Sequence, residues 1–160
     1  AEAAHLARQA AGELTVVLRI DASRPHLSER PAGRPLHPYG SCAGLVFQAF
    51  CERSQWVTFR RAHPFPVYGA PLWGTEAELD AEIERIRENG FCLRRDDGAL
   101  RVGVPYLGRR SSLEGILGAS RTVAETAEGA QTDDAGHTLA SAVRECARRL
   151  SAMAGYAEEP

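Results

Sequence analysis

Residues 74–105 read GTEAELDAEIERIRENGFCLRRDDGALRVGVP, and this stretch decides the fold class. Thr75 and Glu78 form a T-x-x-E capping box, in which side chains satisfy the first free N–H groups of a helix. Apolar residues then recur at helical spacing as far as an Asn-Gly pair, where glycine accepts the left-handed conformation that ends many helices. Two short apolar runs follow, 91–93 and 100–104, on either side of an Asp-Asp-Gly turn. The stretch therefore predicts one capped helix followed by antiparallel strands.

The segments on either side extend this pattern. Ser41 can cap a second helix that continues to Phe50, and alanine-rich residues 2–11 favour a helix ended by Gly12. Residues 58–74 carry three prolines and four aromatic side chains, which predicts an ordered loop held by ring burial. Strands are expected at 14–20 and 112–120, and a last helix at 133–153 with Leu139, Val143, Cys146, Leu150 and Met153 on its buried stripe. Short turns between strands imply antiparallel pairing, so the fold class is α+β, a sheet with helices packed on it.

Bulk properties narrow the function classes. The chain has 160 residues and a net charge of −2, which fits one soluble domain and argues against a chain that grips nucleic acid by itself. The sequence contains no long apolar run and no secretory signal, so we expect a cytoplasmic protein that does not enter a membrane. Its four cysteines form no C-x-x-C pair and its five histidines no metal-binding spacing. We therefore predict no metal and no cofactor, with reduced cysteines that are mostly buried.

Two blocks of the sequence resemble the effector-binding domain of IclR-type transcription regulators. One is the helix ending in ENGF with the charged hairpin, RVGVP, and the later strand closing on GAS; the other is residues 37–50, HPYGSCAGLVFQAF, with its helix glycine Gly44. The resemblance covers roughly residues 5–155 and implies a GAF- or profilin-like fold that binds a small effector and forms a homo-dimer or tetramer. It also implies an upstream winged helix that binds DNA. Residues 1–12 would then end the linker helix from that missing domain, and residues 13–160 would be the effector-binding domain.

The resemblance also implies a ligand site. Backbone at the start of the second helix faces the ligand in the family, and free N–H groups there favour an anion without basic side chains. Tyr39, in the loop before this helix, is a further candidate because of its position. The matching and candidate positions in this chain are Leu36, Tyr39, Cys42, Ala43, Arg94, Arg101, Gly118 and Ser120. Arginine at 94 and 101 departs from the acidic or neutral residues of the family, so we expect a carboxylate-bearing effector with Arg101 as its fork-shaped partner.

Alternatives to this interpretation remain open. Strand alternation puts Leu100 and Val102 on one face and Arg101 on the other, so Arg101 could simply face solvent. Cys42 at a helix start, with His37 as base, could make the chain a free-standing small-molecule enzyme, although no orienting third group is identifiable. A ligand-free interaction module, with its pocket filled by the aromatic loop, is the third possibility. We predict a regulator domain that is not an enzyme.

Overall fold

The computed structural model describes residues 3–10, 12–29, 35–96, 98–123 and 130–156. Within these residues the chain forms a six-stranded sheet in the order β3-β2-β1-β6-β5-β4, with every neighbouring pair antiparallel. The strands are β1 (Ala3–Ala10), β2 (Glu13–Asp21), β3 (Ser28–Glu29), β4 (Cys92–Asp96), β5 (Ala99–Leu107) and β6 (Leu113–Thr122). The helices are α1 (Cys42–Phe50), α2 (Arg53–Ala62), α3 (Phe65–Tyr68), α4 (Ala70–Trp73), α5 (Glu76–Asn89) and α6 (Ala130–Met153). The predicted α+β class with an antiparallel sheet is confirmed.

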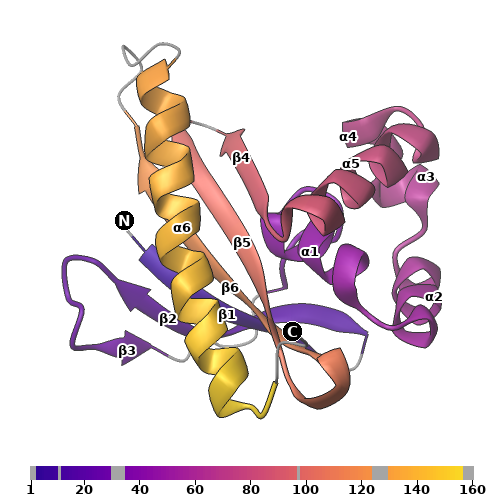
Figure 1. Cartoon of the computed structure of the whole chain (residues 1–160). Helices are drawn as coiled ribbons and strands as arrows, with labels where there is room; N and C mark the ends of the chain where they lie inside the picture. The colour runs from indigo at the N-terminus through magenta and orange to yellow at the C-terminus, as the bar shows by residue number, and fades with distance from the viewer. Residues whose placement is uncertain (1–2, 11, 30–34, 97, 124–129, 157–160) are drawn as a thin grey trace.

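Helices cover the two faces of the sheet unequally (Figure 1). The long α6 lies along β5 and β6 on one face, where Leu139 and Val143 pack against Val102 and Val104. On the other face α1 packs on β5 and β6, and α5 packs on α1, while α2 to α4 lie farther out. The buried core of this second face includes Leu45, Phe47, Phe59, Leu79 and Ile86. The sheet therefore separates two cores, and α1 lies between it and α5.

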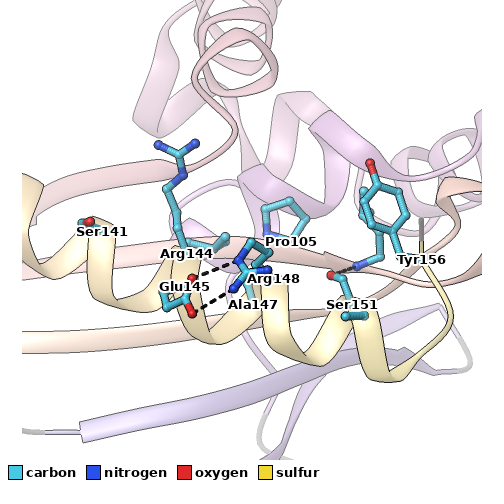
Figure 2. A pocket seen from close by; sticks show the side chains of 11 residues that line it. Pro105, Ser141, Arg144, Glu145, Ala147, Arg148, Ser151 and Tyr156 are labelled. Carbon is cyan, nitrogen blue, oxygen red and sulfur yellow. Dashed lines mark hydrogen bonds and ion pairs between the residues drawn. The ribbon is translucent and has the colours of Figure 1, made fainter. Parts of the chain in front are cut away.

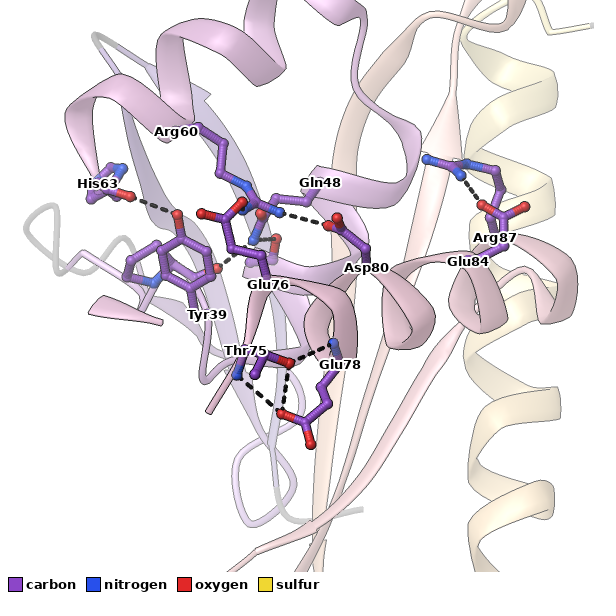
Figure 3. Close-up of polar contacts among 12 residues, drawn as sticks. Tyr39, Gln48, Arg60, His63, Thr75, Glu76, Glu78, Asp80, Glu84 and Arg87 are labelled. Carbon is purple, nitrogen blue, oxygen red and sulfur yellow. Dashed lines mark hydrogen bonds and ion pairs between the residues drawn. The ribbon is translucent and has the colours of Figure 1, made fainter. Parts of the chain in front are cut away.

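Helix α5 begins and ends where the sequence predicts. Thr75 Oγ1 accepts a hydrogen bond from Glu78 N at 3.2 Å, and Glu78 Oε2 accepts one from Thr75 N at 3.0 Å (Figure 3). At the other end Gly90 has φ +76°, the left-handed conformation that the Asn-Gly pair predicts. The hairpin β4–β5 follows directly, as expected.

The helix predicted over residues 2–11 is wrong, because Ala3–Ala10 form β1. This strand lies between β2 and β6 and pairs with both. Alanine favours helices in isolation, but a central strand gains hydrogen bonds on both edges and buries Ala7 completely. Residues 3–10 are therefore part of the sheet and not the end of a linker helix.

The loop predicted over residues 58–74 is also wrong. This region contains the second half of α2 and the short helices α3 and α4. Pro66 and Pro71 sit in the first turns of α3 and α4, where a helix does not need the missing N–H. The expected burial of rings does occur, since Phe59 is fully buried and Phe65 nearly so.

The buried face predicted for α6 is correct in the first part of the helix and wrong in the second. Leu139 and Val143 are buried as expected, but Cys146 is exposed and Met153 is 84% exposed. Small side chains, Ala140 and Ala147 among them, complete the buried face instead. They allow α6 to lie close to the sheet, which a stripe of large residues alone does not predict.

Candidate functional site

A cavity of about 520 Å³ opens between the start of α1 and the face of the sheet that carries α1. Its walls come from the 35–37 segment, the first turn of α1 and the strands β1, β2, β5 and β6. Five of the residues predicted for the ligand site line it, namely Leu36, Cys42, Ala43, Arg101 and Ser120. The structure thus brings together residues that lie up to 84 positions apart in the sequence.

One row of cross-strand partners forms the floor of this region. It runs Arg19–His5–Gly118–Gly103–Cys92 across β2, β1, β6, β5 and β4. A Cβ on Gly118 would lie 2.2 Å from the His5 ring, and a Cβ on Gly103 would lie 3.0 Å from Cys42 Cβ. The two glycines therefore make room for a histidine and for the start of α1 against the sheet.

The start of α1 is held tightly against the preceding segment. Ser41 is the N-cap, and its Oγ accepts from Gly44 N at 3.0 Å and donates to His37 O at 2.7 Å. A Cβ on Gly44 would lie 2.3 Å from Pro38 O, so only glycine fits there. Because the first N–H groups of a helix have no partner within it, those of Cys42 and Ala43 are left at the cavity wall.

The charged groups of the cavity are cationic. Arg19 and Arg101 line it, and no aspartate or glutamate of the described residues does. The Arg101 side chain is 45% exposed, and its Nε lies 3.7 Å from Asp96 Oδ2, a separation too long for a strong pair. This arrangement leaves the Arg101 fork available to a second acceptor.

The two histidines of the cavity contribute in other ways. Burial, and then the charge of Arg19, lower the pKa of His5 below its usual 6.5, so this ring is neutral near pH 7. His37 Nδ1 accepts hydrogen bonds from Tyr39 N at 3.2 Å and Gly40 N at 2.9 Å. The neutral His37 ring must then carry its proton on Nε2, which makes it a hydrogen-bond donor.

Three of the predicted ligand residues, Tyr39, Arg94 and Gly118, do not line the cavity, and Gly118 lies under the His5 ring. Tyr39 is fully buried, and its hydroxyl donates to His63 O at 2.6 Å (Figure 3). Arg94 faces Trp73, whose ring centroid lies 5.4 Å from its guanidinium carbon. Tyr39 is therefore a core residue. Arg94 packs on Trp73, and its charge contributes to the lowered pKa of Cys42 at the start of α1.

Sequence reasoning missed His5 and Arg19 as cavity residues. They are cross-strand partners on β1 and β2, so their position depends on β1 being a strand. The alanine content of that segment hides the strand, but Gly12, which has φ +86° between the two strands, is a signal for a β-hairpin as well as for a helix end. Arg101 lies on the opposite face of β5 from Leu100 and Val102, as alternation predicts, and that face carries α1 and the cavity.

The Cys42–His37 pair of the alternative enzyme interpretation is not observed in the part of the chain that the structure describes. Cys42 Sγ donates to Arg101 O at 3.3 Å, and the thiol also interacts with that of Cys92. The His37 nitrogen that could act as a base already accepts two backbone N–H groups. The geometry thus offers no activated cysteine–histidine nucleophile.

A second cavity, of about 580 Å³, lies on the other face of the sheet between α6 and the end of β5 (Figure 2). Its lining includes Arg144, Glu145 and Arg148, and Glu145 hydrogen-bonds to Arg148 at 2.9 Å. Arg148 and Arg149 hold the pKa of this carboxyl at about 2. The cavity therefore contains its own anion, unlike the cavity at α1.

Neither a metal centre nor a membrane-spanning helix occurs among the described residues. Among the described residues no group of three or more His, Cys, Asp or Glu side chains could hold a metal ion. Nor does any helix in those ranges combine the length and the apolarity needed to cross a membrane.

Comparison with known proteins identifies the fold. No protein-family model and no curated protein sequence matches the chain. Solved structures do match, among them HmgR of Pseudomonas aeruginosa, with a TM-score of 0.71, 22% identity, and coverage of 99% of this chain and 61% of HmgR. A protein described as an IclR transcriptional regulator from Silicibacter sp. TM1040 matches with a TM-score of 0.73 and 21% identity. The match covers 99% of this chain and 62% of that protein. The C-terminal domain of the E. coli transcriptional regulator KdgR matches with a TM-score of 0.69 and 18% identity. The match covers 97% of this chain and 88% of that domain.

These matches show that the chain has the fold found in the C-terminal domains of IclR-type transcriptional regulators. The chain spans about three fifths of the length of HmgR and of the Silicibacter protein. The sequence-based recognition of this fold is therefore confirmed.

Proposed function

We propose that this chain is the effector-binding and oligomerisation domain of an IclR-type transcription regulator, and that its effector is a small organic anion. The observation that carries the proposal is the α1 cavity, which has two arginines and no carboxylate among its described lining residues. The fold it shares with regulator domains supports the class of function. DNA would be bound through a winged-helix domain upstream, and the net charge of −2 agrees with a chain that does not bind DNA by itself.

The chemistry of the cavity favours a carboxylate. A planar carboxylate can accept two parallel N–H bonds from the Arg101 guanidinium, and Arg19 adds a second charge across the floor. The first N–H groups of α1 attract the same anion from the side. The volume of about 520 Å³ lies within the range typical of small-molecule sites and is not filled by the aromatic side chains of 59–73. This open volume argues against the ligand-free interaction module.

Effector binding can control DNA binding only if the ligand prefers one arrangement of two subunits. Strand β5, which carries Arg101, also packs against α6 on the opposite face. A ligand that binds both Arg101 and the start of α1 would therefore also affect the position of α6, because β5 contacts both helices. Sedimentation analysis with and without a bound acid tests the oligomeric part, and an unchanged monomer in both would contradict it.

A thermal-shift screen tests the ligand class. The panel should pair small aliphatic and aromatic carboxylic acids with their neutral amides. An acid at a hundred times its dissociation constant should stabilise the domain by about 2.7 kcal/mol, a rise of roughly 5–10 °C. No shift with any acid, or equal shifts with the amides, would refute the anion hypothesis.

Two matched variants locate the site. Arg101→Gln should weaken binding of the best acid by roughly 10- to 100-fold, because a charge-assisted hydrogen bond is lost. Arg95→Gln removes an exposed arginine from the neighbouring strand, one position along from the residue that pairs with Arg101, and should bind normally. If both substitutions weaken binding equally, the acid responds to the net charge of the protein and not to a contact with Arg101.

A further inference from the structure

Two thiols meet at the base of the α1 cavity. Cys42 is the first residue of α1 and packs over Gly103, where a Cβ would lie 3.0 Å from Cys42 Cβ. Cys92 is the cross-strand partner of that same Gly103. The absence of a side chain at Gly103 lets the two cysteines approach, and each thiol shifts the pKa of the other. Both are reduced.

The two thiols differ in access and in charge environment. Cys42 is 7% exposed and lines the cavity, whereas Cys92 is 1% exposed. The interaction with the Cys92 thiol, followed by the charges of Arg94 and Arg101, lowers the pKa of Cys42, although burial opposes this. The interaction with Cys42 and burial raise the pKa of Cys92. Cys42 is thus the thiol with the lower pKa and the one that a solute can reach, and in its protonated form it donates to Arg101 O at 3.3 Å.

Arg94, whose charge is one cause of the lowered Cys42 pKa, also has an unpaired donor. Its Nη1 is buried and has no hydrogen-bond partner among the described residues. A buried guanidinium N–H without an acceptor is costly, and a negative charge on Cys42 reduces that cost. The position of Arg94 behind α1 therefore favours the thiolate of Cys42.

From this geometry we infer that Cys42 and Cys92 form a redox-active dithiol, a modification site at which a hydroperoxide entering the cavity is reduced and an intrachain disulfide is formed. The inference does not depend on the proposed effector, because it needs only the cavity for access. The other two cysteines lack these features. Burial raises the pKa of Cys51 to about 11, and Cys146 is exposed on α6, on the other face of the sheet.

The reaction has two balanced steps. The Cys42 thiolate attacks one peroxide oxygen, so that an S–O bond forms and the O–O bond breaks. The leaving hydroxide takes up the proton that Cys42 released, giving water and a sulfenic acid. Cys92 sulfur then attacks Cys42 sulfur, the S–S bond forms and the S–O bond breaks, and the departing hydroxide takes the Cys92 proton as a second water. The sulfur pair loses two electrons and the peroxide gains them.

Hydrogen peroxide added to the folded 160-residue chain tests this inference. A Cys51→Ser/Cys146→Ser background leaves only the pair. We expect both remaining thiols to disappear together, the intact mass to fall by two hydrogen atoms, and a proteolytic digest to contain the linked Cys42 and Cys92 peptides. Dithiothreitol should restore both thiols.

Single substitutions separate the two roles. Cys42→Ser should slow thiol loss at residue 92 by at least about tenfold, because a buried neutral thiol reacts poorly. Cys92→Ser or Cys92→Ala should instead let Cys42 proceed to sulfinic acid, since nothing resolves the sulfenic acid. Circular dichroism must show that each variant is folded.

Three results would overturn the inference. One is sulfinic acid at Cys42 in the background protein while Cys92 stays free. Another is disulfide formation only between chains. The last is resistance of both thiols to peroxide until the chain is unfolded by urea.

Discussion

The fit between α1 and the 37–38 segment can be measured by replacing Gly44 with alanine. An alanine in a helix interior is normally better than glycine by about 1 kcal/mol. Here the new Cβ would lie 2.3 Å from Pro38 O and 2.7 Å from His37 O, roughly 1 Å closer than an ordinary contact. Both atoms belong to the backbone, so no side chain can rotate away.

The clash sets the size of the effect. Displacing α1 from this backbone costs about 1–3 kcal/mol as overpacking. The displacement also lengthens or breaks the buried hydrogen bond that Gln48 Nε2 donates to Pro38 O at 3.0 Å. This bond contributes about 1 kcal/mol to stability. After the gain in helix propensity, we expect Gly44→Ala to lower the free energy of unfolding by about 2 kcal/mol and the melting temperature by roughly 4–8 °C.

Gly136→Ala is the matched control. It makes the same change inside α6, where the nearest atom to the new Cβ is Leu93 Cδ2, at 3.0 Å. A leucine side-chain end can rotate, so the propensity gain should survive and stability should be unchanged or higher. Urea unfolding followed by circular dichroism compares the two. If Gly44→Ala is as stable as Gly136→Ala, α1 does not pack against the carbonyls of residues 37 and 38 as described.

Three further predictions concern stability. Thr75→Ala should cost about 1 kcal/mol in urea unfolding because the capping box of α5 is lost, whereas Thr58→Ala on exposed α2 should cost little; equal losses would show that the cap is unimportant. Tyr39→Phe should cost about 1–2 kcal/mol because the buried His63 carbonyl loses its 2.6 Å donor, and an unchanged melting temperature would contradict this. Because burial holds the pKa of His5 below 6.5, the unfolded chain binds a proton that the folded chain resists, so stability should fall as the pH drops below about 6.5 and stay level above about 7.5. His5→Gln should flatten this dependence in urea titrations at pH 5.5 and 7.5, and an identical slope would refute the assignment to His5.

The parts of the fold that could be predicted from sequence are those fixed by local chemistry. The capping box at Thr75 and the left-handed Gly90 depend on atoms within one helical turn, so their residue types suffice. Ser41 caps α1 for the same reason. The strand β1 was missed because its alanine-rich residues favour a helix locally, whereas the structure pairs it with β2, which follows directly, and with β6, which is distant in the sequence.

The candidate site divides in the same way. The start of α1 is a local feature, and a ligand position there can be inferred from the cap alone. The partners of Arg101 cannot, because they follow from register: Ser120 pairs with Arg101 directly, while His5 and Arg19 join through β1. Tyr39 illustrates the opposite error, since a loop position suggests exposure but its hydroxyl and ring are enclosed by α2 and α3.

The floor of the cavity explains how ligand binding and thiol chemistry can share one place. Gly118 and Gly103 are adjacent in one row of the sheet, and each leaves a gap that a side chain from another element fills. His5 enters the first gap and narrows the cavity beneath Arg19 and Arg101, while Cys42 enters the second and thereby reaches Cys92. A side chain at Gly103 would push α1 outward, which would separate the thiols and at the same time move the first N–H groups of α1 away from the arginines. The anion site and the dithiol therefore depend on the same close contact between α1 and β5.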